Sequence, residues 1–277
     1  MERHARVLQR SLRLSFTQAV EHTTILTKLH QIRCLTLCAL LGLGGASVAA
    51  GTQTVRLADS GVYVGELRDG LLHGQGRITW RDGATYIGSF SQGLMHGLGL
   101  YKHPNGYEYS GSYFDGLQHG QGKVRYRNGD EYEGEFHEGE IHGSGLLRGA
   151  RGESYNGDFV DGRFHGAGTY TAQDGSKFSG TFVDGSLNGR GSAQYSNGDR
   201  YIGEFQDDQR HGMGLMIFSN GDRYEGGFEF GNFHGEGRFT DGATGEVLSG
   251  QWKDGEYVSE PGEEPENGSE AMTPRAA

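Results

Sequence analysis

Aromatic and glycine residues recur along this chain at a fixed interval of 23 residues. The leading aromatic residues of the successive intervals are Tyr63, Tyr86, Tyr109, Tyr132, Tyr155, Phe178, Tyr201 and Tyr224. Most intervals read aromatic-x-Gly-x-aromatic, a glycine-bearing loop, His-Gly-x-Gly, a second alternating segment, and then Asn-Gly or Asp-Gly. A period of this length indicates a repeat array in which each unit is stabilised by its neighbours.

Two short strands are predicted in every interval, because apolar and polar positions alternate with a period of two. In one copy Tyr132 and Phe136 fall on one face of the strand, and Glu133 and Glu135 fall on the other. The glycine-bearing loop would close each hairpin, and pairs such as Asn128-Gly129 would form type I′ turns to the next interval. We therefore predict an all-β fold, an elongated single-layer antiparallel meander of stacked 23-residue β-hairpins.

The two faces of this sheet differ in chemistry. One is a ladder of aromatic rings and glycines, which we interpret as the core, with a binding groove along the same rings as the second interpretation. The other face is expected to set acids against bases across the strands, at Glu66, Glu135, Asp158 and Glu204 against Arg77, Lys123, Arg125 and Arg148. Exposed pairs of this kind contribute about 0–1 kcal/mol each.

The repeated pattern Tyr-x-Gly-x-Phe-x-x-Gly-x-x-His-Gly-x-Gly resembles the MORN repeat (membrane occupation and recognition nexus) over residues 63–255. The copy that begins at Tyr132 matches it at every defining position. The resemblance implies a twisted sheet of stacked hairpins, of the kind that mediates protein contacts, dimerisation or membrane association. Departures from the pattern are local and put single turns in doubt, at Leu67, Arg151, Asn188 and Asp208.

The repeats divide the chain into five parts. Residues 1–51 form a cationic leader with an apolar stretch at 34–50, and residues 52–62 supply an N-terminal edge strand. Eight repeats at 63–246 are followed by a partial ninth repeat at 247–255 and an acidic tail at 256–277, which is predicted to be disordered. The leader fits a cleaved export signal, an uncleaved membrane anchor or, ranked below these, an organellar transit peptide. We expect an exported protein, periplasmic or extracellular, or a membrane-anchored one.

Charge and cysteine content exclude several classes of function. The chain holds 25 Lys and Arg against 36 Asp and Glu, and residues 51–277 alone carry a net charge of −15. Nucleic-acid binding needs clustered cations, so no nucleic-acid partner is expected. The only cysteines are Cys34 and Cys38, so residues 51–277 contain no cysteine for a disulfide or a metal site.

Seven histidines occupy one position of the repeat, at His73, His96, His119, His142, His165, His211 and His234. Equivalent residues of successive hairpins should lie about 9–10 Å apart, which is too far for two of them to share a Zn²⁺ ion. We interpret them as histidines hydrogen-bonded in the loop before a glycine-rich corner. No catalytic constellation, metal site or cofactor motif emerges from the repeating background, so we expect neither an enzyme nor a cofactor.

Apolar residues break the polar face in the second and seventh repeats. The residues concerned are Ile87, Leu98 and Leu100, and Ile202, Met213, Leu215 and Ile217. Contiguous exposed apolar side chains mark a contact surface, and cover by the N-terminal segment is the alternative. The sequence thus predicts a non-catalytic scaffold, exported or membrane-tethered, that binds a protein partner or a second copy of itself. The alternative is a module that associates with membranes or phospholipids, and residues 34–50 offer a second route to a membrane.

Overall fold

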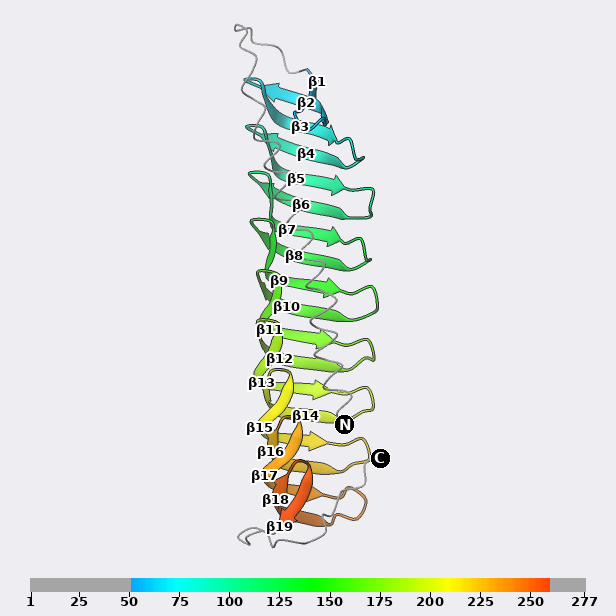
Figure 1. Ribbon diagram of the computed structural model, residues 1–277, viewed down its shortest axis with the longest axis vertical. Coiled ribbons are helices and arrows are strands. Elements are labelled where there is room, and N and C mark those ends of the chain that lie inside the picture. Colours follow the sequence, from blue (N-terminus) through cyan, green and yellow to red (C-terminus); the bar gives the residue numbers. More distant parts are fainter. Residues whose placement is uncertain (1–50, 260–277) are drawn as a thin grey trace. The chain divides into compact units, whose positions relative to one another are not determined.

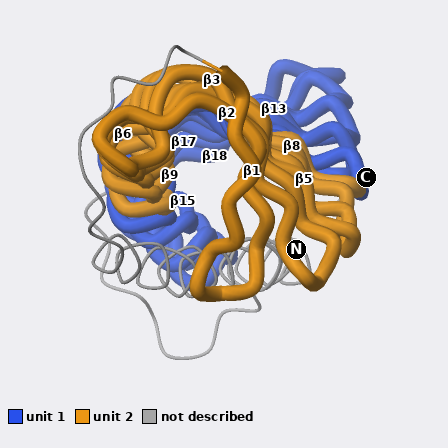
Figure 2. Tube along the Cα trace, turned by 90° about the horizontal axis from the view of Figure 1, so that it is seen from above, with its two compact units in different colours: residues 1–13, 151–157, 164–277 blue, residues 14–150, 158–163 orange. Residues whose placement is uncertain are grey.

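A computed structural model describes residues 51–259, and every regular element in that range is a β-strand (Figure 1). The apolar stretch at 34–50 and residues 260–277 of the tail lie outside the described residues. The described chain divides into two compact units, shown in Figure 2. Unit 2 holds residues 51–150 and 158–163, and unit 1 holds residues 151–157 and 164–259.

Strands follow one another in unit 2 as an antiparallel meander. Each pairs with the next along the chain, from β1 with β2 to β8 with β9. The strands are β1 Gln53–Arg56, β2 Val62–Arg68, β3 Leu71–Thr79, β4 Thr85–Ser91, β5 Leu94–Lys102, β6 Glu108–Phe114, β7 Leu117–Arg125, β8 Glu131–His137 and β9 Glu140–Arg148.

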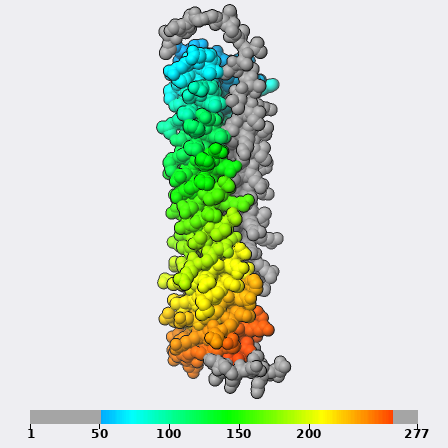
Figure 3. All heavy atoms as spheres, turned by 90° about the vertical axis from the view of Figure 1, so that its left-hand side faces the viewer, coloured from blue at the N-terminus to red at the C-terminus, as the bar shows by residue number. Residues whose placement is uncertain are grey.

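Unit 1 repeats the same arrangement with antiparallel pairs from β11–β12 to β18–β19. β10 Ser154–Val160 falls on the division between the units. The remaining strands are β11 Arg163–Thr171, β12 Lys177–Val183, β13 Ser186–Gln194, β14 Arg200–Gln206, β15 Gln209–Ile217, β16 Arg223–Glu229, β17 Asn232–Thr240, β18 Val247–Lys253 and β19 Glu256–Ser259. The prediction of an all-β antiparallel meander of hairpins is confirmed. In the space-filling view the repeats of each unit pack against one another in sequence order (Figure 3).

The core of each unit is the aromatic ladder that the alternation predicts. Tyr132 is fully buried, and its ring meets Phe136 of its own repeat and Phe159 of the next one edge to face, at 5.3 and 5.2 Å. The ring lies directly on Gly134 and Gly145, which face each other across β8 and β9. A side chain at either glycine would occupy the volume of the ring, which is why the pattern needs glycine at both positions.

A bulge follows each glycine pair and bends the hairpin. Gly134 pairs with Gly145 and Phe136 pairs with Ile141, so β9 carries extra residues between the two pairs. At the bulge, the hydroxyl of Tyr132 donates a hydrogen bond to the backbone carbonyl of Glu135 at 3.0 Å. Bulges of this kind bend a strand and increase its local twist, and Figure 2 shows the strands of both units strongly bent.

The two kinds of turn are the reverse of what the sequence predicted. The type I′ turns lie within each hairpin, as at Glu138-Gly139, where both residues have positive φ (49° and 87°). At Asn128-Gly129 only the glycine does (93°), and the amide of Gly129 donates to the carbonyl of Tyr126 at 3.0 Å. The connection between repeats is therefore a three-residue loop, a type I turn followed by a left-handed glycine. The prediction of type I′ turns there is wrong, because two X-Gly pairs in each repeat satisfy the same rule.

Hydrogen bonds at the hairpin turns and at several connecting loops tie successive hairpins together. At the hairpin turn, the amide of Gly139 donates to the carbonyl of Gln118 in the preceding repeat at 2.9 Å. At the connecting loop, the carboxylate of Asp130 accepts a hydrogen bond from the amide of Ala150 at 2.9 Å. The hairpin-turn bond recurs at the other junctions. The loop bond recurs in unit 1 at Ser176, Asp199 and Asp222, whereas Ala84 and Tyr107 take the position of Asp130 in two repeats of unit 2.

The C-terminal boundary moves relative to the sequence prediction. Residues 256–259, which were assigned to the tail, form β19 and pair with β18. Tyr257 explains the difference: its ring packs on Trp252 at 5.4 Å and its hydroxyl donates to the carbonyl of Ser249 at 3.1 Å. The ninth repeat is thus a complete, short hairpin. At the other end, the predicted edge strand is present as β1.

Candidate interaction surface

The seven predicted contact residues lie on the face opposite the aromatic ladder, here called the outer face. Four are well exposed: Ile87 at 49%, Leu98 at 70%, Ile202 at 59% and Met213 at 61%. Leu100, Leu215 and Ile217 are half-buried. We call Ile87, Leu98 and Leu100 the first patch, which lies in unit 2, and the other four residues the second patch, which lies in unit 1.

Strand register explains why each patch is contiguous. Ile87 on β4 stands directly opposite Leu100 on β5, and Ile202 on β14 stands opposite Leu215 on β15. Directly opposed residues have Cβ atoms about 4.5–5.5 Å apart, so these side chains adjoin one another. Met213, Leu215 and Ile217 alternate along β15, which gives the second patch a stripe that follows one strand.

Two exposed phenylalanines extend the patches, and the sequence analysis missed both. Phe114 is 54% exposed and its ring lies 5.2 Å from that of His96, two residues before Leu98. Phe230 is 70% exposed and lies 6.1 Å from His211, two residues before Met213. Phe230 also has φ of 48° in a turn position where most other repeats carry Asp, Glu or Gln. That exchange of a polar residue for an aromatic one was the available signal.

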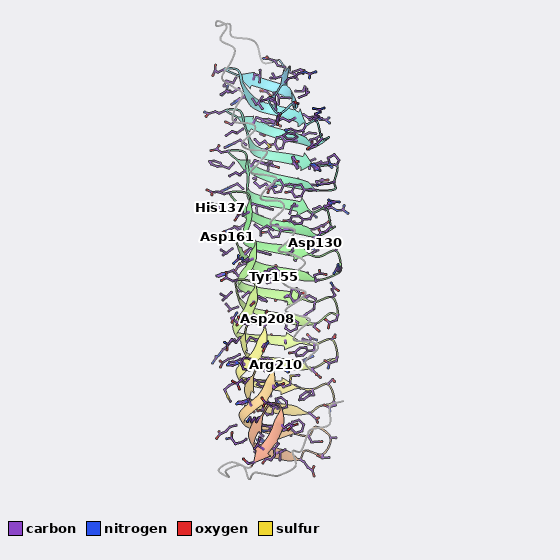
Figure 4. All side chains as sticks on the ribbon, in the orientation of Figure 1. Asp130, His137, Tyr155, Asp161, Asp208 and Arg210 are labelled. Atoms are coloured by element: carbon purple, nitrogen blue, oxygen red, sulfur yellow. The ribbon has the colours of Figure 1, made fainter. Side chains whose placement is uncertain are left out.

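The histidines line the outer face near the hairpin turns. A chain of ring contacts runs in unit 2 from His96 through Phe114 and His119 to His137 and His142, at 5.1 to 5.8 Å. His137, which is labelled in Figure 4, is not one of the seven repeat histidines, and its ring contacts those of His119 and His142. Residues 51–259 contain no group of three or more His, Cys, Asp or Glu side chains arranged to hold a metal ion.

In three of these histidines one ring nitrogen makes no hydrogen bond. The Nδ1 atoms of His96, His165 and His234 are buried and have no hydrogen-bond partner. His96 Nδ1 lies 3.5 Å from a carboxylate oxygen of Asp115 in the next repeat, an ion-pair distance only if the imidazole is protonated. Asn188, which replaces a histidine, accepts a hydrogen bond from the amide of Asp207 at 3.1 Å. The amide side chain makes the bond that the ring does not.

Charged pairs on the outer face involve other acids than expected. Glu135 lies over the bulged Gly143, as Glu66 and Glu204 do over their own glycines. The bulge thus takes these carboxylates away from the basic rows. The lysines of unit 2 pair elsewhere: Lys102 with Glu108 at 3.1 Å, and Lys123 with Glu131 and Glu133 at 3.7 and 3.9 Å.

The ladder face carries one cation of note. Arg210 takes a position that apolar residues fill in most repeats, and it donates to the carbonyl of Gly231 and to the sulfur of Met216. Its guanidinium lies 5.5–6.0 Å from the ring centroids of Tyr195, Tyr201 and Phe228. Burial raises the pKa of Tyr195 above its ordinary value, and the Arg210 charge partly offsets this rise. This arrangement satisfies the arginine within the ladder, which is consistent with the interpretation of that face as the core.

The family to which the chain belongs follows from its repeats. The family model described as MORN repeat matches residues 63–85, 86–106, 109–131, 132–154, 155–177, 178–200, 201–223 and 224–243. These segments make up more than half of the chain, and the protein belongs to the MORN-repeat family. MORN repeats indicate a repeat scaffold for interaction with proteins or membranes. Among residues 51–259, no helix has the length and apolar character needed to cross a bilayer.

Comparisons with individual proteins add little. No curated protein matches the sequence. Among solved structures, the chain is similar to the TCP domain of SAS-4 (dCPAP) from Drosophila melanogaster, solved in complex with a proline-rich motif of Ana2. The two sequences are 11% identical, the match covers 78% of this chain and 99% of that chain, and the TM-score is 0.28. The TCP10 domain of Danio rerio CPAP is similar at 14% identity, with 72% and 100% coverage and a TM-score of 0.27. Scores this low carry no argument about function.

Proposed function

We propose that this MORN-repeat protein is a non-catalytic scaffold that binds a protein partner, or a second copy of itself, through its outer face. The observation that carries the proposal is the pair of exposed apolar patches, at positions of the outer face that are polar in most repeats. Ile202 and Met213 leave 59% and 61% of their surface in contact with solvent. Burying such side chains against a partner is favourable by about 25 cal/mol per Å² of apolar area. A strand face that carries only polar side chains gains no such free energy.

The aromatic ladder supports assigning contacts to the outer face. Its rings are almost completely buried, as at Tyr63, Tyr86 and Tyr224, each with no exposed surface. They therefore hold the hairpins together and leave little apolar area for a partner. The export or membrane tethering of the chain is part of the same proposal, and it rests on residues 34–50. Mass spectrometry of the mature N-terminus tests it, because a cleaved signal would remove those residues.

A double substitution tests the contact. Met213→Glu with Leu215→Glu places two charges in the second patch, and we expect loss of self-association in sedimentation, or loss of the partner that co-purifies with the wild-type chain. The matched control is Ala167→Glu with Thr169→Glu, which alters the same two repeat positions on β11, outside both patches. If the two double variants behave alike in both measurements, the contact proposal is wrong. Binding of the wild type to anionic vesicles, abolished by the patch variant alone, would favour a membrane module instead.

A further inference from the structure

A row of cations crosses the outer face of unit 1 beside the second patch. Strand register aligns Lys177, Gln194, Arg200, Ile217 and Arg223 across β12 to β16. Lys177, Arg200 and Arg223 are all exposed. Within residues 51–259, none of the three forms an ion pair with a carboxylate. Ile217 of the second patch stands directly between the two arginines.

The equivalent row of unit 2 contains acids as well as bases. The repeat itself therefore does not impose a row of unpaired cations such as the one in unit 1, here called the open row. In unit 2 the register aligns Lys102, Glu108, Arg125, Glu131 and Arg148, so that acids alternate with bases. Lys102 and Glu108 make an ion pair at 3.1 Å. The repeat position that carries the two glutamates in unit 2 carries Lys177, Arg200 and Arg223 in unit 1, and the position that carries bases in unit 2 carries uncharged Gln194 and Ile217.

The acids nearest to the open row are occupied or displaced. Asp199 and Asp222 directly precede Arg200 and Arg223 in sequence, but their carboxylates accept hydrogen bonds from the amides of the next connecting loop at 2.9 and 2.8 Å. Glu204 lies over a bulged glycine, and Glu225 stands opposite Leu215 and Arg238. The cations thus present their charge outward, in a chain whose residues 51–277 carry a net charge of −15.

From this juxtaposition we infer that the second patch docks an acidic, amphipathic protein segment that runs across β12 to β16, with its carboxylates on Lys177, Arg200 and Arg223 and its apolar side chains on Ile202, Leu215 and Ile217. The inference deepens the proposed function, on which it rests, by naming the class of partner. Arginine pairs bidentately with carboxylates, so two of the three anchors favour this chemistry.

Strand spacing fixes the pattern of the partner. The cations lie on every second strand, so they repeat at about 9.5 Å. A helix rises about 10.5 Å in seven residues, and an extended chain covers about 10 Å in three. The partner should therefore carry acids about seven residues apart if helical, or three apart if extended, with apolar residues on the adjacent side.

Charge distribution favours a peptide over a membrane. An anionic bilayer presents a plane of charge to much of the protein surface within a Debye length of about 8–10 Å, and the net charge of residues 51–277 is strongly negative. A peptide that fits between β12 and β16 meets chiefly the three cations. The three cations therefore attract a short acidic segment, whereas the net negative charge of the protein repels an extended anionic surface.

Selection from a random library of peptides about 16 residues long, displayed against the full chain, tests the inference. We expect the enriched sequences to be acidic and amphipathic with the spacing given above. Their affinity should fall with rising salt, and by roughly two- to fivefold for each of Arg200→Gln and Arg223→Gln. The control variants Arg125→Gln and Arg148→Gln, in the equivalent row of unit 2, should leave affinity unchanged.

Four outcomes would overturn the inference. Enriched peptides without an acidic excess would do so, as would peptides that bind the Arg200→Gln and Arg223→Gln variants as well as the wild type. Phosphatidylserine vesicles that bind the wild type, and lose binding with these variants while no peptide is retained, would assign the row to a membrane. Loss of binding with Met213→Glu and Leu215→Glu, but not with the arginine variants, would leave the proposed apolar contact intact and remove only the acidic partner.

Discussion

Replacing Gly145 with alanine should destabilise unit 2 by filling the space that a tyrosine ring already occupies. A Cβ atom at Gly145 would meet the Cε2 and hydroxyl oxygen of Tyr132, whose ring is fully buried. Overpacking of this kind costs about 1–3 kcal/mol. If the ring tilts away, the hydrogen bond from its hydroxyl to the Glu135 carbonyl is lost, at about 1 kcal/mol more. The expected loss is therefore about 2–4 kcal/mol.

Urea unfolding followed by tryptophan fluorescence measures this loss in the right part of the chain. The protein has two tryptophans, Trp80 in unit 2 and Trp252 in unit 1. In a Trp252→Phe background, the signal reports on unit 2 alone. The control is Gly70→Ala, also in unit 2, where no atom lies within 4 Å of the added carbon but φ is 78°. That change should cost only about 1 kcal/mol, from the left-handed backbone.

A double-mutant cycle separates the steric cause from any other. Tyr132→Ala removes the ring and should itself be strongly destabilising, by about 3–5 kcal/mol. With the ring gone, Gly145→Ala should add little, so the two losses should fall short of additivity by about 1–3 kcal/mol. Additive losses would show that the ring does not set the size of residue 145. So would a Gly145→Ala variant as stable as the wild type.

Two further predictions concern a turn and the buried tyrosines. Asp208 has φ of 69° where other repeats have glycine, and its carboxylate accepts a hydrogen bond from the amide of Leu187 at 2.7 Å. Asp208→Gly should therefore leave the thermal midpoint nearly unchanged, whereas Asp208→Ala should cost about 1–2 kcal/mol; equal midpoints for the two would contradict the role of the carboxylate. Burial raises the pKa of Tyr107 and Tyr170 to about 12. Their contribution to stability is thus complete below the ordinary tyrosine pKa of 10.0 and is lost as the pH rises towards 12, and a flat urea midpoint over this range would contradict it.

Periodicity made most of the fold predictable, because 23-residue spacing and alternation together define strands, faces and core positions. The exchange of turn types was harder to foresee. Glu138-Gly139 and Asn128-Gly129 are both X-Gly pairs, and only the residue count between paired strands separates a two-residue turn from a three-residue loop. The bulge was also hidden, and it moved Glu135 away from the cations of the outer face.

The candidate surface was predictable where it obeyed the alternation and hidden where it did not. Ile202, Met213 and Leu215 stand at positions that are polar in most copies, so comparison of the repeats found them. Phe230 stands in a turn, outside the alternating strands, and His137 stands one residue beyond the second aromatic position. The open cation row required the strand register, since only pairing shows that Ile217 separates Arg200 from Arg223.

The hairpin-turn hydrogen bond that recurs between repeats allows the gene to change its length. Each hairpin offers its neighbour a backbone carbonyl at the same repeat position and receives an amide from the same turn position in return. Unequal recombination between two copies would therefore add or remove whole units without creating an unfamiliar boundary. The outer-face residues make none of these ties, so substitutions there can accumulate after a duplication. A lineage can thus acquire a new recognition surface by copying a unit first and altering its outward side chains later.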